Sequence, residues 1–153
     1  MRLWLLRHGE AEPRARTDAE RNLTEGGRRD VRRSATFLRG KPLQVVLVSP
    51  YQRAQQTADE VCKALGFSGR RETVDWATPE SDLEEALRAL DLRGESDLLL
   101  VTHQPFVGNL AEAPELLYTR ENKPFVSCRV LVNRRVQNDE GSGSTTSPPL
   151  TTS

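Results

Sequence analysis

Hydrophobic residues gather in short runs that alternate with longer segments of helical spacing. Buried strands of a parallel sheet are predicted over residues 3–7, 44–49 and 97–102, because each range holds a short apolar run. Residues 73–76 form a weaker run, and residues 125–132 alternate well enough for a last strand that suits a sheet edge. The pattern therefore predicts five strands.

Amphipathic helices are predicted between these strands, over residues 24–38, 51–65, 81–92 and 106–117. Thr24 is placed as the N-cap of the first helix, and Gly40 ends that helix. Gly66 closes the second helix. Thr78, followed by a proline, is the expected N-cap of the third helix.

Strands and helices alternate along the chain, which predicts the α/β class. The short crossovers indicate a three-layer domain, with a mostly parallel sheet and helices on both faces. The length of 153 residues is that of one domain. Residues 137–153 hold one leucine and no aromatic residue, so they cannot bury enough surface to offset their ordering entropy. We predict a folded domain over residues 1–136 and a disordered polar tail over residues 137–153.

Charge and composition narrow the possible partners. Lys and Arg number 22, as do Asp and Glu, so the net charge gives no general support for nucleic-acid binding. The apolar run near the N-terminus, residues 3–6, is too short for a membrane span or a signal peptide. We expect a soluble cytoplasmic protein. Cys62 and Cys128 lie far apart, which indicates neither a disulfide scaffold nor a zinc site, and Cys62 is expected in the core.

Three predicted strands end in residues that can carry chemistry. Arg7 and His8 follow the first strand, Arg53 lies in the first turn after the second, and His103 follows the fourth. Carboxyl ends of parallel strands share one edge of a sheet, where ligands bind in open α/β folds, so one site is predicted. Two guanidinium groups beside a helix start favour a phosphate-like anion. A neutral His8 can attack phosphorus, and positive neighbours are expected to lower its pKa.

Four motifs in order carry a resemblance to a known family: RHG after a strand, LTEGG before a helix, SPYQRAQQTA and VTHQP. The chain resembles the histidine phosphatase superfamily, which includes phosphoglycerate mutases, and most of all its compact SixA-type phosphohistidine phosphatases. The resemblance covers most of residues 1–115. It implies a phosphoglycerate mutase-like fold, with His8 as phosphorylated nucleophile, Arg7 and Arg53 as phosphate clamps and His103 as second pocket histidine. We expect a metal-independent enzyme without a cofactor.

The general acid is not assigned by the sequence. Larger mutase-like relatives carry a glutamate acid in an insertion between the second arginine and the second histidine, and here the interval from Arg53 to His103 is short. Its acids near a strand end, Glu80, Asp82 and Glu84, are interpreted as charges at a helix N-terminus. An imidazole is readily protonated and departs neutral, so it needs less acid catalysis than an alkoxide. The missing acid therefore favours phosphohistidine over phosphate esters.

The leading hypothesis is a phosphatase acting on phosphohistidine in a signalling protein, such as a histidine-containing phosphotransfer domain, through a phosphoenzyme at His8. A small-molecule phosphomonoesterase or mutase of the same superfamily is an alternative, and so is a noncatalytic phosphoryl-binding module. The two histidines could also be ordinary hydrogen-bonded residues or metal ligands.

Other charged residues leave two interpretations open. Glu10 either orients residues of the site without touching the substrate or is solvated in a loop. A basic stretch is either a solvated surface or a docking site for an acidic protein. Its members are Arg14, Arg16, Arg28, Arg29, Arg32 and Arg33. Beyond Arg135 the chain resembles nothing in the family.

Overall fold

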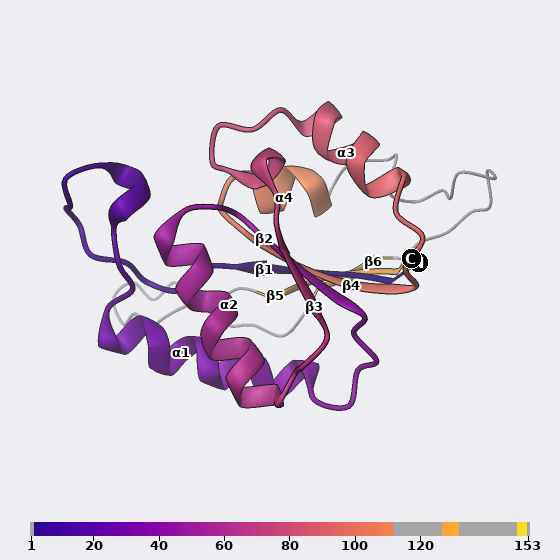
Figure 1. Cartoon of the computed structure of the whole chain (residues 1–153), viewed down its shortest axis with the longest axis horizontal. Coiled ribbons are helices and arrows are strands. Elements are labelled where there is room, and N and C mark those ends of the chain that lie inside the picture. Colours follow the sequence, from indigo (N-terminus) through magenta and orange to yellow (C-terminus); the bar gives the residue numbers. More distant parts are fainter. Residues whose placement is uncertain (1, 112–126, 132–149, 153) are drawn as a thin grey trace.

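A six-stranded sheet in the order β3-β2-β4-β1-β5-β6 forms the centre of the molecule (Figure 1). The computed structural model describes residues 2–111, 127–131 and 150–152. The strands are β1 (Arg2–Arg7), β2 (Val45–Val48), β3 (Arg70–Thr73), β4 (Asp97–Thr102), β5 (Ser127–Leu131) and β6 (Leu150–Thr152). All pairings are parallel except that of β5 with β6. The mostly parallel sheet is thereby confirmed.

Helices cover both faces of the sheet. They are α1 (Glu25–Ala35), α2 (Gln52–Leu65), α3 (Leu83–Asp91) and α4 (Phe106–Ala111), with 3₁₀ turns η1 (Asp18–Glu20), η2 (Thr36–Leu38) and η3 (Asp75–Ala77). Successive strand residues point to opposite faces. Leu3 and Leu5 of β1 pack in the core with α3 and α4, whereas Trp4 and Leu6 pack with α1 and α2. Figure 1 shows the resulting three layers, as the sequence predicts.

Two predicted helix ends are confirmed in detail. The Thr24 hydroxyl accepts a hydrogen bond from the Gly27 amide at 2.9 Å, which caps α1. Gly66 ends α2 with a left-handed φ of 63°. The Glu10 carboxylate accepts a hydrogen bond from the Thr24 hydroxyl at 2.9 Å. Glu10 thus ties the loop that follows His8 to the start of α1.

The third strand is displaced from its prediction. The structure places β3 at Arg70–Thr73, whereas residues 73–76 were the expected strand. The hydrophobic pattern fails because β3 is an edge strand whose side chains reach solvent. Arg71 pairs there with Asp59, and Glu72 pairs with Arg93. Charge pairs of this kind leave no apolar run in the sequence.

The third helix begins later than predicted, and Thr78 is not its N-cap. Asp82 occupies that position, and α3 begins one residue further on. Thr78 instead closes a turn, because its carbonyl accepts from the Ser81 amide at 3.1 Å and its hydroxyl contacts the Ser81 hydroxyl at 2.8 Å. A hydroxyl held in that turn is not available as a helix cap.

The C-terminal elements differ in part from the prediction. The predicted last strand is β5, but it lies between β1 and β6 and not at the edge. β6 lies within the predicted tail and pairs with β5 through Leu150–Thr152. Their backbone groups pair with those of β5, which does not require apolar side chains. The rest of residues 137–153, and residues 112–117 of the predicted last helix, lie outside the described residues.

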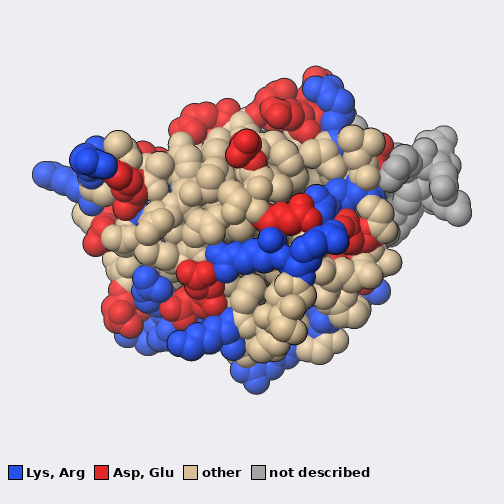
Figure 2. Space-filling model, viewed as in Figure 1, with Lys and Arg blue, Asp and Glu red and all other residues tan. Residues whose placement is uncertain are grey.

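Basic and acidic side chains are interspersed on the face shown in Figure 2. Within the predicted basic stretch, several arginines are ion-paired: Arg16 with Glu20, Arg28 and Arg32 with Glu60, and Arg33 with Asp30. This pairing favours the interpretation as a solvated surface. The free Cys62 thiol is half-buried at the margin of the core. None of the helices in the described ranges is both long and apolar enough to cross a membrane.

Candidate active site

The predicted site residues follow three neighbouring strands. In the sheet, β4 lies between β2 and β1, so the carboxyl ends of all three meet at one edge. The backbone continues this pairing beyond the strands. The His8 amide donates to the Thr102 carbonyl at 3.0 Å, and the Ser49 amide donates to the Val101 carbonyl at 3.1 Å. The three segments that carry the site are thus hydrogen-bonded to one another.

His8 presents an unprotonated nitrogen toward Arg53. Its Nδ1 lies 2.6 Å from the Gly9 carbonyl oxygen, and its Nε2 accepts a hydrogen bond from Arg53 Nε at 3.2 Å. Because a carbonyl can only accept, Nδ1 carries the hydrogen and Nε2 holds the lone pair. Burial lowers the pKa of His8 to about 4, and the charges of Arg53 and Arg7 act in the same direction. His8 is therefore neutral at physiological pH.

Arg53 is a buried guanidinium, 4% exposed, in the first turn of α2. Its Nη1 donates to the Asp18 carbonyl at 2.7 Å, and its Nη2 donates to the Asp18 carboxylate at 3.1 Å. Arg21 also donates to that carboxylate at 2.8 Å, and these bonds keep the pKa of Asp18 below its ordinary value. A guanidinium has five N–H groups, so two of those on Arg53 have no acceptor among the described residues.

His103 is buried directly beside His8. The two rings are in edge contact, with centroids 5.0 Å apart. His103 Nε2 lies 2.8 Å from the Ser49 hydroxyl, which already accepts from the Tyr51 amide at 3.2 Å. A hydroxyl has one donor hydrogen and two acceptor lone pairs, so Ser49 can pair with Nε2 in either tautomer of the ring. Nδ1 is buried and has no partner in the described part of the chain. Burial is the largest cause that lowers the pKa of His103 to about 3, and the neighbouring His8 lowers it as well.

Arg7 completes the predicted set. Its side chain is half-buried at the end of β1, and its charge lowers the pKa of both His8 and His103. Arg7 directly precedes His8 and is in register with Thr102, which directly precedes His103. The structure therefore brings Arg7, His8, Arg53 and His103 together at one edge of the sheet.

The sequence is similar to a known protein family and to named relatives. The sequence model of the histidine phosphatase superfamily (branch 1) matches residues 3–77. Phosphohistidine phosphatase SixA of Escherichia coli is 36% identical over 72% of this chain and 71% of its own length. The chain belongs to the histidine phosphatase superfamily. A SixA homolog of Haemophilus influenzae is 31% identical to this histidine phosphatase over 80% of each chain.

Solved structures agree with this assignment. The protein histidine phosphatase SixA complexed with tungstate superimposes on this histidine phosphatase with a TM-score of 0.67 and 32% identity, over 78% of each chain. An Escherichia coli α-ribazole-5′-phosphate phosphatase, putative by its description, has a TM-score of 0.59 at 20% identity over 76% of this chain and 79% of its own, which shows the fold alone. The predicted phosphoglycerate mutase-like fold is thereby confirmed.

Two residues that support the site of this histidine phosphatase were not predicted, although both lie in the motif SPYQRAQQTA. Ser49 is the partner of His103 described above. Thr57 accepts from the Gly9 amide at 3.0 Å and donates to the Arg53 carbonyl at 2.8 Å. The hydroxyl of Thr57 thus joins the loop after His8 to the helix that carries Arg53. Their hydroxyl side chains within this motif are the sequence signal that could have indicated both residues.

Glu80 and Tyr51 also lie at the site, which corrects the interpretation of Glu80 as a charge in a helix first turn. Glu80 precedes α3 and accepts a hydrogen bond from the Tyr51 hydroxyl at 2.9 Å. The Tyr51 ring lies 5.2 Å from the ring of His103, and the Arg53 guanidinium lies 5.1 Å from its centre. Glu84, by contrast, does lie in the first turn of α3, and Asp82 is the N-cap.

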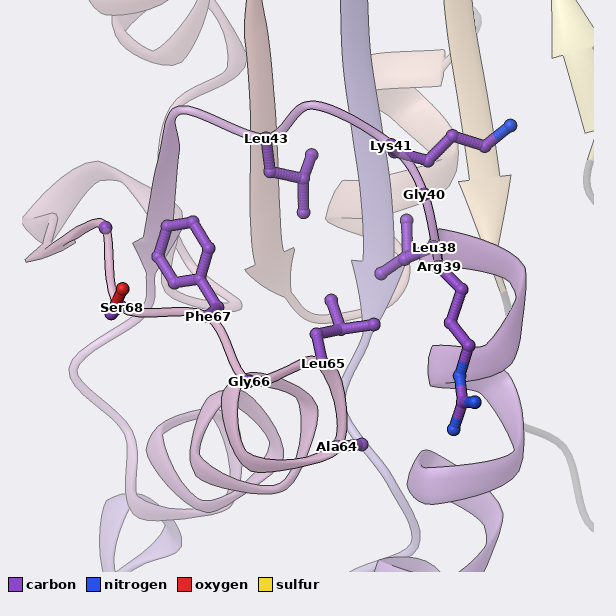
Figure 3. A pocket seen from close by; sticks show the side chains of 11 residues that line it. Leu38, Arg39, Gly40, Lys41, Leu43, Ala64, Leu65, Gly66, Phe67 and Ser68 are labelled. Atoms are coloured by element: carbon purple, nitrogen blue, oxygen red, sulfur yellow. The ribbon is translucent and has the colours of Figure 1, made fainter.

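The opposite edge of the sheet holds a pocket of about 500 Å³ between η2 and the end of α2 (Figure 3). Leu43, Leu65 and Phe67 point toward its centre in this view, and Lys41 extends away. None of the four predicted site residues lines it. In the described ranges, no group of three or more His, Cys, Asp or Glu side chains is placed to hold a metal ion.

Proposed function

We propose that this chain is a phosphohistidine phosphatase that works through a covalent phosphohistidine at His8. The observation that carries the proposal is the contact between His8 Nε2 and Arg53 Nε at 3.2 Å. It places an unprotonated nucleophile beside the guanidinium that would hold the phosphoryl group. Relatives named phosphohistidine phosphatase SixA support this choice of substrate.

In the first step, His8 Nε2 attacks phosphorus, and the bond between phosphorus and the substrate nitrogen breaks. The electron pair of that bond returns to the substrate imidazole. Arg53 has two N–H groups to offer the phosphoryl oxygens, and Arg7 adds a second charge near both rings. Water then attacks the phosphoenzyme, which releases phosphate and restores His8.

His103 has a distinct role in this scheme. We assign the hydrogen of its neutral ring to Nδ1, which is buried with no partner among the described residues, and the ring is in edge contact with that of His8. A phosphoryl oxygen in the site would give this buried group its hydrogen bond. Since the pKa of His103 is lowered to about 3, the ring would act as a neutral donor rather than a second cation.

We further propose that the substrate is a phosphorylated protein in the cytoplasm, such as a histidine-containing phosphotransfer domain of a signalling system. The exposed side chains of Asp18 and Glu80 at the site support access by a protein surface. The free Cys62 thiol is compatible with a reducing compartment.

The test is to incubate the purified chain with phosphoramidate or with p-nitrophenyl phosphate, each with and without a chelator. We expect rapid release of phosphate from the phosphoramidate, slower hydrolysis of the ester, and the same rates with chelator. Preference for the ester would indicate a phosphomonoesterase. Binding of phosphate without turnover of either compound would indicate a phosphoryl-binding module.

A further inference from the structure

A group of side chains at the site has no part in the phosphoryl transfer described above. Tyr51 follows β2 and sets its ring against both His103 and Arg53, at 5.2 and 5.1 Å. The ring is half-buried, so one side meets the working groups and the rest faces outward. Tyr51 therefore borders the phosphate-binding groups and is partly accessible to solvent.

Two carboxylates accept hydrogen bonds from the residues of this group. Glu80 accepts from the Tyr51 hydroxyl at 2.9 Å, and Asp18 accepts from Arg53 Nη2 at 3.1 Å. Burial raises the pKa of Tyr51, and the hydrogen bond to Glu80 and the negative charges of Glu80 and Asp18 raise it further, so the hydroxyl stays protonated. The Asp18 side chain is 52% exposed, and Glu80 is exposed as well. Each carboxylate has lone pairs left for a donor that arrives from solvent.

We propose that Tyr51, Asp18 and Glu80 form a leaving-group subsite that favours a protonated phosphoimidazole over a phosphate ester. The inference rests on the proposed function, because it assigns the selection of that substrate to named residues. The Tyr51 ring offers a flat surface for an aromatic ring, and a cationic ring is attracted both to its face and to the two carboxylates.

The chemistry of the leaving group explains what the carboxylates contribute. A phosphoimidazole carries phosphorus on one ring nitrogen and, when protonated, a hydrogen on the other. When the bond to phosphorus breaks, its electron pair stays on the first nitrogen and the proton stays on the second, so neutral imidazole departs. A carboxylate that accepts a hydrogen bond from the second nitrogen stabilises this protonated form. No further proton donor is required.

A phosphate ester gains nothing from the two carboxylates. Its leaving oxygen has no N–H to donate, and an ionised carboxylate cannot supply a proton. The negative charge of Asp18 and Glu80 would instead repel an anionic ester that approaches the site. The subsite thereby distinguishes a nitrogen leaving group from an oxygen leaving group, independently of the groups that hold the phosphoryl oxygens.

The experiment measures kcat/KM for phosphoimidazole and for p-nitrophenyl phosphate in the wild type, Asp18→Asn, Glu80→Gln and the double variant. We define the ratio as kcat/KM for phosphoimidazole divided by kcat/KM for p-nitrophenyl phosphate. Loss of a hydrogen bond to a charged acceptor should lower this ratio at least about 10-fold in the double variant. The matched control is Glu20→Gln. It removes a carboxylate from the same 3₁₀ turn as Asp18, but one that is paired with the exposed Arg16, so its ratio should equal that of the wild type.

The ratio separates the subsite from a purely supporting role. If Asp18 only holds Arg53 in place, both substrates lose rate equally and the ratio stays constant, which would overturn the proposal. A ratio unchanged in Glu80→Gln and in the double variant would overturn it as well. A wild-type protein that leaves phosphoimidazole intact would instead refute the proposed function, and the subsite with it. Thermal unfolding of each variant verifies that these exposed substitutions leave the fold intact.

Discussion

Replacement of Arg53 by lysine is the most direct test of the phosphate clamp. The change keeps one positive charge but replaces a planar fork of five N–H groups with a single ammonium. In the structure, the guanidinium bridges His8 Nε2 on one side and Asp18 on the other, while two N–H groups remain for a phosphoryl group. An ammonium is a single point and cannot occupy all these positions.

The expected loss in rate exceeds the expected loss in stability. Removal of one preorganised transition-state donor lowers kcat by about 100 to 1,000-fold, or roughly 2.7–4 kcal/mol. A lost hydrogen bond costs the folded state about 0.5–1.5 kcal/mol. The ionic contact with Asp18 adds little to that, because the carboxylate is 52% exposed and screened by water. We therefore expect Arg53→Lys to lower kcat at least ~100-fold and to leave the protein folded.

The assay is single-turnover quench-flow with a phosphohistidine substrate, combined with urea denaturation. Arg71→Lys serves as the matched control. Arg71 donates to Asp59 at 2.6 Å and to two oxygens of Gln55 at 2.9 and 3.0 Å, so it also makes three contacts, but it lies outside the site. Its lysine variant should lose similar stability and keep the wild-type rate. A change in kcat below about threefold for Arg53→Lys would refute the role of Arg53 in transition-state stabilisation.

Three further predictions concern the nucleophile, pH and packing. His8→Ala should abolish turnover and the acid-labile phosphate trapped on the wild type, with little change in urea denaturation. The pKa of His8 falls from 6.5 to about 4 on folding, so below pH 6.5 the unfolded chain binds the proton more strongly than the folded chain. The free energy of unfolding should therefore fall as the pH drops from 6.5 toward 4. Urea titrations should show a smaller fall in His8→Ala. Gly27→Ala would put a Cβ 2.3 Å from the Glu10 carbonyl and should cost about 1–3 kcal/mol in thermal unfolding, whereas Gly94→Ala meets open space and should not.

The core of the fold is accessible from the sequence because burial marks it. The residues of β4 are all buried, and the apolar run Leu98–Val101 within the predicted strand 97–102 marks its place correctly. The edge strand β3 carries charged side chains in ion pairs, which depend on partners distant in sequence, such as Arg93 for Glu72. No local pattern records such partners, and the strand was therefore misplaced.

The same distinction applies to the site. His8, Arg53 and His103 follow predicted strands, and the shared edge of a parallel sheet is sufficient to bring them together. Asp18 reaches Arg53 from a 3₁₀ turn in an irregular stretch, where neither spacing nor residue type marks it. Glu80 was assigned to a helix that begins later, because Thr78 closes a turn. Sequence patterns locate what strands position, whereas loop contacts require coordinates.

The pairing of β1 with β4 affects how the protein acquires activity during folding. Arg2 is in register with Asp97, so the two paired strands that precede His8 and His103 are separated by most of the described sequence. Contacts between such distant segments carry a large loop-closure entropy and form slowly, whereas helices form within microseconds. Phosphoryl transfer by a refolding chain should therefore return later than its helical circular dichroism signal. The return of catalytic activity would thus report when the central sheet forms during refolding.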